Sequence, residues 1–323
     1  MKLPDRAELD AARDIVRAVV PPTPAYAWPL LRERLGTEVI VKHENHTPTG
    51  AFKVRGGLVY FDRLARREPA CPGVVSATRG NHGQSVALAA ARNGMPATIV
   101  VPRGNSREKN AAMRGLGATL VEYGEDFQES REHAAHLAAA GGLHMVPSFH
   151  RDLILGVATY WMELLGAHPD IDVVFVPIGL GSGICSAIVA RQVLGLKCAI
   201  IGVVSELAPA YALSFAAGRA IEAPVSTLLA DGMACRTPDP ESLAMILAHM
   251  DDVVQVSDAQ VAAAMKIYFI ATHNVAEGAG AAPLAAALAH PELVRGRRVG
   301  LPLCGGNVDH DVFAEVLLRP LPD

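Results

Sequence analysis

The sequence predicts an α/β protein with two domains, each built on an open, mostly parallel sheet covered by helices. Half of the 323 residues are hydrophobic, which is enough for a large buried core. The short apolar segments are continuous runs of Val, Ile, Leu and Ala, which are typical of parallel strands buried on both faces. Helical patterns separate these runs, as the crossovers of a parallel sheet require.

Seven segments are expected to form strands. They cover residues 39–42, 73–76, 97–101, 118–122, 173–177, 199–204 and 299–303. None of them alternates apolar with polar residues, so each is expected to be covered on both faces.

Helices are expected between the strands, at residues 5–19, 85–92, 107–114, 127–140, 184–194 and 258–272. The first helix is ended by the prolines that begin at Pro21, and others end at glycines such as Gly94 and Gly195. Ser257 and Gln260 form a capping-box pattern that marks the start of the last helix. These signals come from backbone chemistry and agree with the apolar pattern.

The chain is expected to divide into a small domain inserted within a large one. Residues 71–150 contain three expected strands and their helices, enough for a small domain, and residues 147–150 form the return crossing. Residues 1–70 and 151–323 are expected to form the large domain, which binds the cofactor inferred below.

Composition excludes several classes of function. The net charge is −4 with both signs mixed, so neither nucleic acid nor a membrane surface is expected as a partner. No apolar signal segment or membrane-spanning run is visible, so a cytoplasmic protein is expected. The five cysteines are odd in number and form no Cys-x-x-Cys pair, which argues against a disulfide framework and a zinc site.

Lys53 follows the first expected strand by a Thr-Pro-Thr-Gly turn at residues 47–50. It lies in the first turn of a helix expected to begin at about Phe52. An ammonium group there meets the positive end of the helix dipole, so the pKa of Lys53 is expected to fall. A lysine that loses its proton easily suits Schiff-base chemistry. The alternative is an ordinary solvated lysine.

Residues 76–84 form a turn between a strand and a helix, with the sequence Thr-Arg-Gly-Asn-His at residues 78–82. Backbone N–H groups at such a turn bind carboxylates or phosphates. The alternative is an ordinary loop in which Asn81 caps the helix.

Residues 176–186 form a glycine-rich loop between a strand and a helix, with the spacing Gly-x-Gly-x-Gly from Gly179 to Gly183. Glycine lets the backbone approach an anion closely, and the helix dipole adds attraction. A dinucleotide fingerprint is less consistent, because no acidic residue ends the next strand and Glu206 lies just beyond it. The loop therefore suits one phosphate, or it is a tight turn without a ligand.

Residues 301–309 form another strand that ends in glycines, with Cys304 at its end. This thiol is either a small buried apolar group or a weak donor toward a ring nitrogen. The four loops are expected at the carboxyl ends of parallel strands, where open α/β sheets bind ligands. A lysine, an anion-binding turn, a phosphate cradle and a thiol together indicate pyridoxal 5′-phosphate.

These motifs, in this order from Tyr26 to Asp309, resemble those of the fold type II pyridoxal-phosphate enzymes, the tryptophan synthase β-like fold. The similarity is greatest to the serine/threonine dehydratase (ammonia-lyase) and serine racemase group. It implies that Lys53 forms the Schiff base with the cofactor. The cofactor-binding residues that it implies are Phe52, Lys53, Asn81, Gly179, Leu180, Gly181, Ser182, Gly183, Glu277 and Cys304. The substrate-binding residues are expected to be Thr78, Arg79, Gly80 and His82.

The resemblance implies β-elimination of a 3-hydroxy-L-amino acid such as threonine or serine, giving a 2-oxo acid and ammonia. Asn81 would hydrogen-bond the phenolic oxygen of the cofactor, and Cys304 would face its ring nitrogen. A neutral thiol there leaves the nitrogen largely unprotonated, which favours elimination over transamination. The alternatives are an amino-acid racemase, a dehydratase for 3-hydroxyaspartate or a phenylserine-like substrate, and a non-catalytic protein that binds the cofactor.

Two positions depart from the pattern of this group. Arg79 stands where relatives usually have Ser or Ala; arginine stays protonated, so two-base racemisation is disfavoured. Arg79 could bind a substrate carboxylate or a second anionic group, or pair with a nearby acid. Some relatives bind a divalent cation through a Glu and an Asp six residues later, but here Glu206 is followed by Ala212, so no metal is expected.

The chain ends soon after the Cys-Gly-Gly-Asn loop, so no C-terminal regulatory domain is expected. The expected partners are a small-molecule amino-acid substrate and a second copy of the chain, because a homodimer is common in the group.

Overall fold

The larger of two sheets carries most of the predicted strands. The computed structural model describes residues 3–321. The strand order of this sheet is β1-β2-β10-β7-β8-β9. These strands are β1 (Ala25–Ala27), β2 (Val39–His43), β10 (Val299–Leu303), β7 (Val173–Pro177), β8 (Ala199–Ser205) and β9 (Asp252–Val256). Among them β1 pairs antiparallel with β2, and the other neighbours are parallel.

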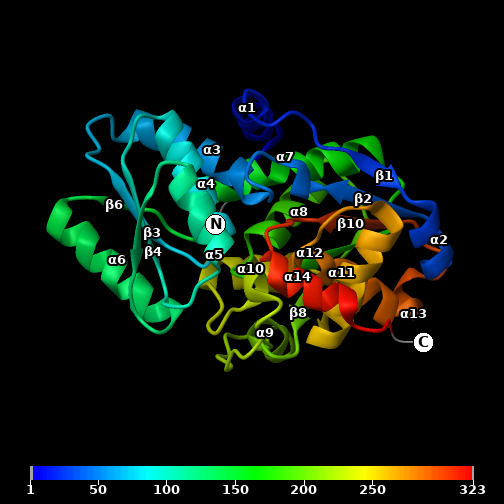
Figure 1. Cartoon of the computed structure of the whole chain (residues 1–323). Coiled ribbons are helices and arrows are strands. Elements are labelled where there is room, and N and C mark those ends of the chain that lie inside the picture. The colour runs from blue at the N-terminus through cyan, green and yellow to red at the C-terminus, as the bar shows by residue number, and fades with distance from the viewer. Residues whose placement is uncertain (1–2, 322–323) are drawn as a thin grey trace.

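The smaller sheet lies beside the larger one (Figure 1) and is parallel throughout its described pairs. Its order is β5-β4-β3-β6. The strands are β3 (Val74–Ala77), β4 (Ala97–Val101), β5 (Thr119–Glu122) and β6 (His144–Met145). All four strands fall within the small domain expected at residues 71–150, and the exact domain boundaries stay a prediction.

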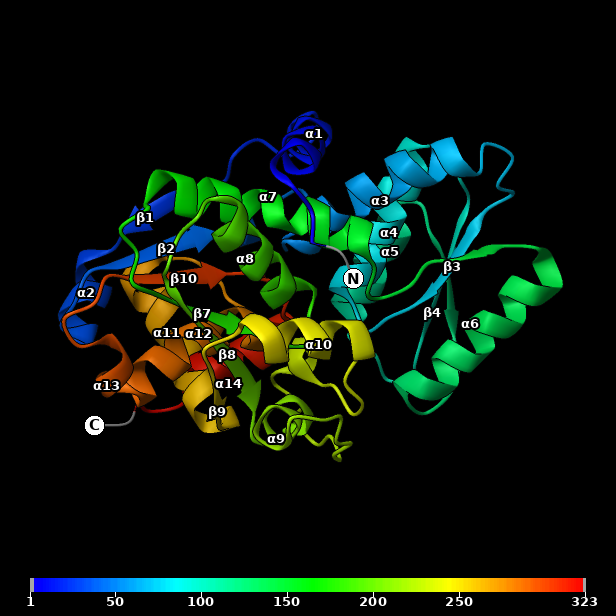
Figure 2. The ribbon, with the colours of Figure 1, turned by 180° about the vertical axis from the view of Figure 1, so that it is seen from behind.

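Helices cover both faces of each sheet (Figures 1 and 2). The first half of the chain contains α1 (Arg6–Arg17), α2 (Pro29–Leu35), α3 (Lys53–Arg67), α4 (Asn81–Arg92), α5 (Arg107–Gly115), α6 (Phe127–Gly141) and α7 (Arg151–Ala167). The second half contains α8 (Ser182–Val193), α9 (Ala210–Ala217), α10 (Pro240–His249), α11 (Asp258–Thr272), α12 (Gly278–Ala289), α13 (Pro291–Val294) and α14 (His310–Leu318). Two 3₁₀ turns are η1 (Glu44–His46) and η2 (Asp231–Met233). None of the helices in residues 3–321 is long and apolar enough to span a membrane.

The core explains why the strand predictions are confirmed to within one residue. Val39 and Val41 of β2 pack with α11 and α12, whereas Ile40 packs with α7 and α8 on the opposite face. In the smaller sheet, Val74 and Val75 likewise belong to clusters on opposite faces. Because both faces of the inner strands are buried, most of their positions are apolar and the alternating pattern disappears. The expectation that every predicted strand is covered on both faces was wrong for β5, which lies at a sheet edge with Thr119 and Glu122 exposed. The predicted α/β class with mostly parallel sheets is confirmed.

The predictions missed elements that show a different pattern. β9 lies at the edge of its sheet and alternates between exposed and buried residues, so it does not resemble the buried runs. β1 and β6 have only three and two residues, too few to give a signal. α7 and α12 are buried along most of their length and present no long polar face. The predicted start of α4 at residue 85 was wrong, because the helix begins at Asn81.

Helices α3, α4 and α7 connect the two sheets. α3 packs against both α7 and α4, and α7 in turn packs against α8 under the larger sheet. Figure 2 shows α3 and α4 between the larger sheet and β3. The loops that follow β2, β3, β7 and β10 therefore meet between the sheets.

Candidate active site

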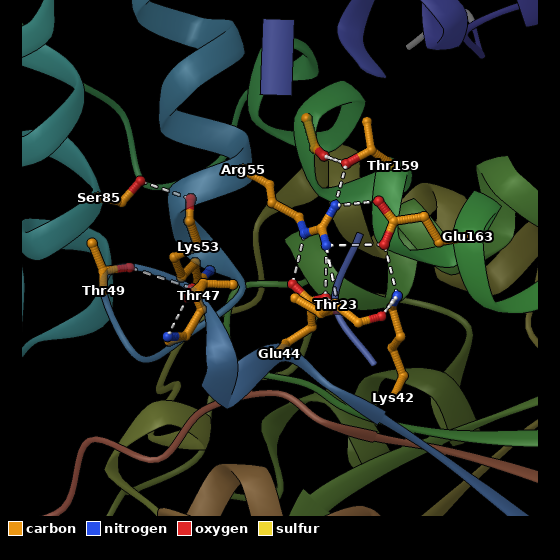
Figure 3. A network of polar contacts seen from close by, with 12 residues as sticks. Thr23, Lys42, Glu44, Thr47, Thr49, Lys53, Arg55, Ser85, Thr159 and Glu163 are labelled. Atoms are coloured by element: carbon orange, nitrogen blue, oxygen red, sulfur yellow. Dashed lines mark hydrogen bonds and ion pairs between the residues drawn. The ribbon is translucent and has the colours of Figure 1, made fainter. Parts of the chain in front are cut away.

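Lys53 is the first residue of α3 and lies between the two sheets. Its Nζ donates a hydrogen bond of 2.7 Å to Ser182 Oγ and lies 5.0 Å from the centre of the Phe52 ring. The backbone N–H of Phe52 donates to the carbonyl of Cys304 at 3.0 Å, which ties this turn to the end of β10. Ser85 Oγ donates to the carbonyl of Lys53 at 2.7 Å (Figure 3). The turn that carries Lys53 is thus held by contacts with α4, the start of α8 and the end of β10.

The environment of Lys53 favours its neutral amine. Burial lowers the pKa of Lys53 to about 8, and the nearby Cys304 and Glu277 oppose this change only in part. The sequence predicted the direction of this shift from the helix dipole, whereas the main cause is burial of the amine. Lys53 is therefore not an ordinary solvated lysine.

The glycine-rich loop leads into α8, whose first residue is Ser182 and whose N-cap is Gly181. Gly181 has φ of 101°, a left-handed conformation that favours glycine. The Leu180 carbonyl accepts a hydrogen bond of 3.1 Å from Tyr211 Oη, which holds the loop against α9. The first N–H groups of a helix lack helical partners and lie at its positive end, so they suit an anion.

Two glycines of this loop, Gly179 and Gly181, have no room for a side chain. A Cβ at Gly179 would lie 2.4 Å from the carbonyl oxygen of Gly232, and one at Gly181 would lie 1.8 Å from Ser242 Oγ. Gly183 is less crowded, since its Cβ would lie 3.7 Å from the Phe52 ring. Gly179 and Gly181 therefore let the loop pack closely against η2 and α10, while the N–H groups at the start of α8 suit a single phosphate.

Asn81 joins the smaller sheet to the larger one. Its Nδ2 donates to Glu277 Oε1 at 2.6 Å, and its Oδ1 accepts from Asn307 Nδ2 at 2.8 Å. One amide hydrogen of Asn81 remains free for a ligand. The alternative that Asn81 caps α4 is wrong, because it is the first helical residue and Gly80 is the N-cap.

Glu277 and Cys304 are buried on the other side of Lys53. Burial, assisted by Asp231, raises the pKa of Glu277 above the usual carboxyl range, although Lys109 and Asn81 act in the opposite direction. Burial and the Glu277 charge raise the pKa of the Cys304 thiol, so that it stays protonated. The thiol approaches the Ala279 carbonyl at 3.7 Å. Cys304 is thus a buried thiol, and its expected contact with a ring nitrogen stays a prediction.

The turn before α4 is held by its own threonine. Thr78 Oγ1 accepts hydrogen bonds from the N–H groups of Gly80 at 3.0 Å and Gly83 at 3.3 Å. His82 Nε2 is buried without a hydrogen-bond partner in the described residues. Burial and the Lys53 charge lower the pKa of His82 to about 3, so this imidazole is neutral near physiological pH.

Arg79 lies in this turn and is exposed. Among residues 3–321 it is absent from every ion pair, so the alternative that it pairs with a nearby acid is wrong. A free guanidinium at the edge of an anion-binding turn is available to a ligand.

These residues fit pyridoxal 5′-phosphate. Its aldehyde requires an amine that can lose its proton, and its phosphate requires a backbone cradle, which Lys53 and the start of α8 provide. Glu277 Oε2 and His82 Nε2 are buried polar atoms without hydrogen-bond partners in the described chain. Buried polar groups normally have partners, so the unpartnered His82 Nε2 agrees with a bound molecule, whereas Glu277 Oε2 already faces Lys109 Nζ at 3.7 Å.

A network of buried charges supports the first turn of α3 (Figure 3). Arg55 Nε donates to Glu44 at 2.7 Å, and its other nitrogens donate to Glu163 at 2.9 and 3.0 Å. Lys42 Nζ donates to Glu163 at 2.7 Å. The network joins β2 and α7 to the turn that carries Lys53 and contains two charges of each sign. Sequence reasoning did not assign it, although Lys42 after the apolar residues 39–41 and Glu163 within the apolar run of α7 were signals.

Sequence reasoning also missed three polar residues that complete the site: Asn307, Lys109 and Asp231. Asn307 lies in the Cys-Gly-Gly-Asn loop, but no role was assigned to it. Lys109 contacts Asp231 across the two sheets, and neither residue belongs to a local motif. In the described residues, no group of three or more His, Cys, Asp or Glu side chains could hold a metal ion. Glu206 is exposed.

The lowered pKa of Lys53 predicts how the apo-protein takes up pyridoxal phosphate. Only the neutral amine attacks an aldehyde, so the rate should rise with pH and level off above about 8. Stopped-flow absorbance between pH 6 and 10 would measure this, with Lys53→Ala as the control that forms no covalent bond. A rate that keeps rising up to pH 10 would show that the amine has an ordinary pKa.

Comparisons with known proteins agree with this geometry. Residues 16–305 match the family described as "Pyridoxal-phosphate dependent enzyme". The chain is 34% identical to the L-threonine ammonia-lyase of Thermotoga maritima over 97% of this chain and 78% of that protein. It is 31% identical to the L-threo-3-hydroxyaspartate ammonia-lyase of Saccharomyces cerevisiae, over 98% of this chain and 97% of that protein. The processed threonine deaminase isoform 2 of Solanum lycopersicum has a similar structure, with a TM-score of 0.87, 30% identity, and coverage of 97% of this chain and 93% of that one.

The family match at residues 16–305 covers both sheets and reaches Gly305 of the fourth loop. It agrees with the fit of the cofactor to Lys53 and the start of α8. The chain therefore belongs to the family of pyridoxal-phosphate dependent enzymes and has the fold of type II.

Proposed function

We propose that this enzyme dehydrates and deaminates a 3-hydroxy-L-amino acid, such as threonine or serine, to a 2-oxo acid and ammonia. The observation that carries the proposal is Lys53 Nζ, whose pKa is about 8, placed 2.7 Å from Ser182 at the start of the phosphate cradle. Identity of 34% to an L-threonine ammonia-lyase supports the reaction type.

Each residue has a role that follows from its chemistry. Ser182 and the glycine loop would hold the phosphate, and Asn81 would donate its free amide hydrogen to the phenolic oxygen. The bound cofactor would supply electron withdrawal that stabilises negative charge at Cα of the substrate. Lys53, once the substrate amine has replaced it, would remove the Cα proton as a neutral base. The protonated Cys304 thiol would face the ring nitrogen without protonating it, which favours elimination over transamination.

The turn at residues 78–82 would bind the substrate. The backbone N–H groups of residues 79, 81 and 82, which Thr78 Oγ1 does not bind, would suit the α-carboxylate, as at other helix starts. A racemase is less well supported, because Arg79 stays protonated and cannot return a proton to the opposite face.

A second candidate substrate is 3-hydroxyaspartate. The exposed Arg79 forms no ion pair in the described chain, so it could bind a second carboxylate. Identity of 31% to an L-threo-3-hydroxyaspartate ammonia-lyase supports this candidate. A phenylserine-like substrate has no such support from a charged group.

Arg79→Ala should raise KM for 3-hydroxyaspartate by about 10- to 100-fold, since hydrogen bonds to charged groups contribute about 1.5–3 kcal/mol. KM for threonine should change by less than about threefold, within the range of a surface substitution. Steady-state kinetics with both substrates would measure the difference. Arg92→Ala, at the exposed C-terminal end of the helix that follows this turn, is the matched control. An equal increase for both substrates would exclude selection of the side chain, and no increase would exclude any binding role for Arg79.

The reaction type is tested by a panel of threonine, serine, 3-hydroxyaspartate and phenylserine. The cofactor-loaded enzyme should release ammonia and the matching 2-oxo acid in equal amounts from at least one of them. Formation of the D-isomer without ammonia would instead identify a racemase. A change in cofactor absorbance without any product would identify a protein that binds the cofactor without turnover.

We also propose that the enzyme is a cytoplasmic homodimer. The five cysteines are free thiols, which agrees with a reducing compartment. The dimer is inferred from the resemblance to the dehydratase group. Light scattering after gel filtration should give twice the mass of the chain, and the mass of one chain would contradict the dimer.

A further inference from the structure

Lys109 of α5 crosses from the smaller sheet to the larger one beside the active site. Its Nζ donates a 2.6 Å hydrogen bond to Asp231 of η2 and lies 3.7 Å from Glu277 Oε2. The side chains of Lys109 and Glu277 are only 7% and 4% exposed, whereas that of Asp231 is 26% exposed, so Lys109 and Glu277 meet away from solvent and Asp231 lies nearer to it. Glu277 is the residue that accepts the Asn81 amide at 2.6 Å. Lys109 therefore reaches Asn81, a proposed ligand of the cofactor, through one intervening residue, Glu277.

The stem of Lys109 also touches the substrate turn. A Cβ at Gly80 would lie 2.4 Å from Lys109 Cδ, so the methylene chain packs directly on the Gly80 backbone. This position lies between Arg79 and Asn81. One side chain thus contacts the turn from one side and Glu277 from the other.

Five groups face the Glu277 carboxylate from different elements. Lys109 and Asn81 favour the charged form of Glu277, whereas burial and Asp231 favour its neutral form. Lys53 and Cys304 are close enough for their own pKa values to respond to the Glu277 charge. Burial lowers the pKa of Lys109, but Asp231 and Glu277 outweigh this and raise it, so Lys109 stays charged. Without Lys109, two carboxylates would share a buried site without this counter-charge, which is costly.

We propose that Lys109 is a positioning residue that orients Asn81 through Glu277, supports the Gly80 turn and supplies the counter-charge for the Glu277 carboxylate. This inference rests on the proposed function insofar as Asn81 contacts the cofactor. Lys109 itself touches neither substrate nor cofactor and acts through Glu277 and Gly80.

The neighbouring residue Arg107 gives a matched control. It lies in the same first turn of α5 and pairs with Asp311 of α14 at 2.8 Å, but its side chain is 78% exposed, whereas that of Lys109 is 7% exposed and contacts Glu277. Loss of an ion pair between the sheets can therefore be separated from loss of a contact with Glu277.

The experiment compares Lys109→Met, Lys109→Arg, Asp231→Asn and Arg107→Met, each loaded with pyridoxal phosphate. Absorbance of the bound cofactor is first titrated with pH in the absence of substrate, and kcat and KM are then measured. Lys109→Met should move the midpoint of the absorbance change upward by about one pH unit, because loss of the Lys109 charge raises the pKa of Glu277. A neighbouring opposite charge shifts a pKa by about 1–3 units. Its kcat should fall by about 100-fold with a smaller change in KM, because a misplaced group lowers the rate more than binding.

The other variants should respond in different ways. Lys109→Arg should restore most of both properties, and Arg107→Met should change neither. Asp231→Asn should move the midpoint downward, the opposite direction, and it carries the test if Lys109→Met fails to fold. An unchanged midpoint and kcat in folded Lys109→Met, an unchanged midpoint in Asp231→Asn, or equal effects of Arg107→Met would overturn the inference. The titration needs no substrate, so expected midpoints without ammonia release would contradict the proposed function alone.

Discussion

Replacing Lys53 by alanine should lower kcat by about a thousandfold or more while the protein still folds. Loss of a residue that acts as both covalent attachment point and base typically costs about 10³- to 10⁶-fold. The fold should survive because the change removes a partly buried amine whose burial disfavours its charged form. Ammonia release under saturating substrate would measure kcat, and circular dichroism would check the fold.

The control for this substitution is Lys197→Ala, which removes an exposed lysine from the loop between α8 and β8, before the amino end of β8, and should leave kcat unchanged. A folded Lys53→Ala enzyme with kcat within tenfold of the original would contradict the assignment of Lys53 as the base.

Replacing Arg55 by methionine should destabilise the enzyme by about 3–5 kcal/mol, since breaking a buried charge pair leaves its partner charge unpaired. Arg55 and Glu44 are both 0% exposed, and Arg55 also holds Glu163. Urea unfolding of the cofactor-loaded protein would measure the change. The double variant Arg55→Met with Glu44→Gln should recover part of the loss, because one unpaired carboxylate is then removed.

The matched control is Arg66→Met on the same helix. Arg66 pairs with Asp62 at 3.0 Å, but its side chain is 74% exposed, so the loss should stay below about 1 kcal/mol. Equal losses for Arg55→Met and Arg66→Met would show that burial of the network does not matter for stability.

The fold was predictable where one physical cause dominated the sequence. Strands such as β7 and β10 are covered on both faces, so burial leaves continuous apolar runs with clear ends. β9 lies at the sheet edge, where some of its residues are exposed and polar. Its mixture of polar and apolar residues was therefore not recognised as a strand. The capping box of Ser257 and Gln260 was predictable because it depends on neighbours three residues apart.

The candidate site was predictable only as far as its chemistry is local. Lys53 and the glycine loop lie in short motifs whose geometry follows from the strand before them and the helix after them. Lys109 and Asp231 are 122 residues apart in sequence, and Asn81 and Glu277 are 196 apart, so no local pattern indicates their contacts. The cause of the Lys53 pKa shift was also hidden, because burial depends on the packing of distant segments.

The most direct test of this account is to find where the cofactor attaches. The cofactor-loaded enzyme would be treated with borohydride, which fixes the bond between the aldehyde carbon and a lysine nitrogen, and then digested for mass spectrometry. The account predicts a single modified lysine, Lys53. Modification of another lysine, or of none, would contradict the central role given to Lys53.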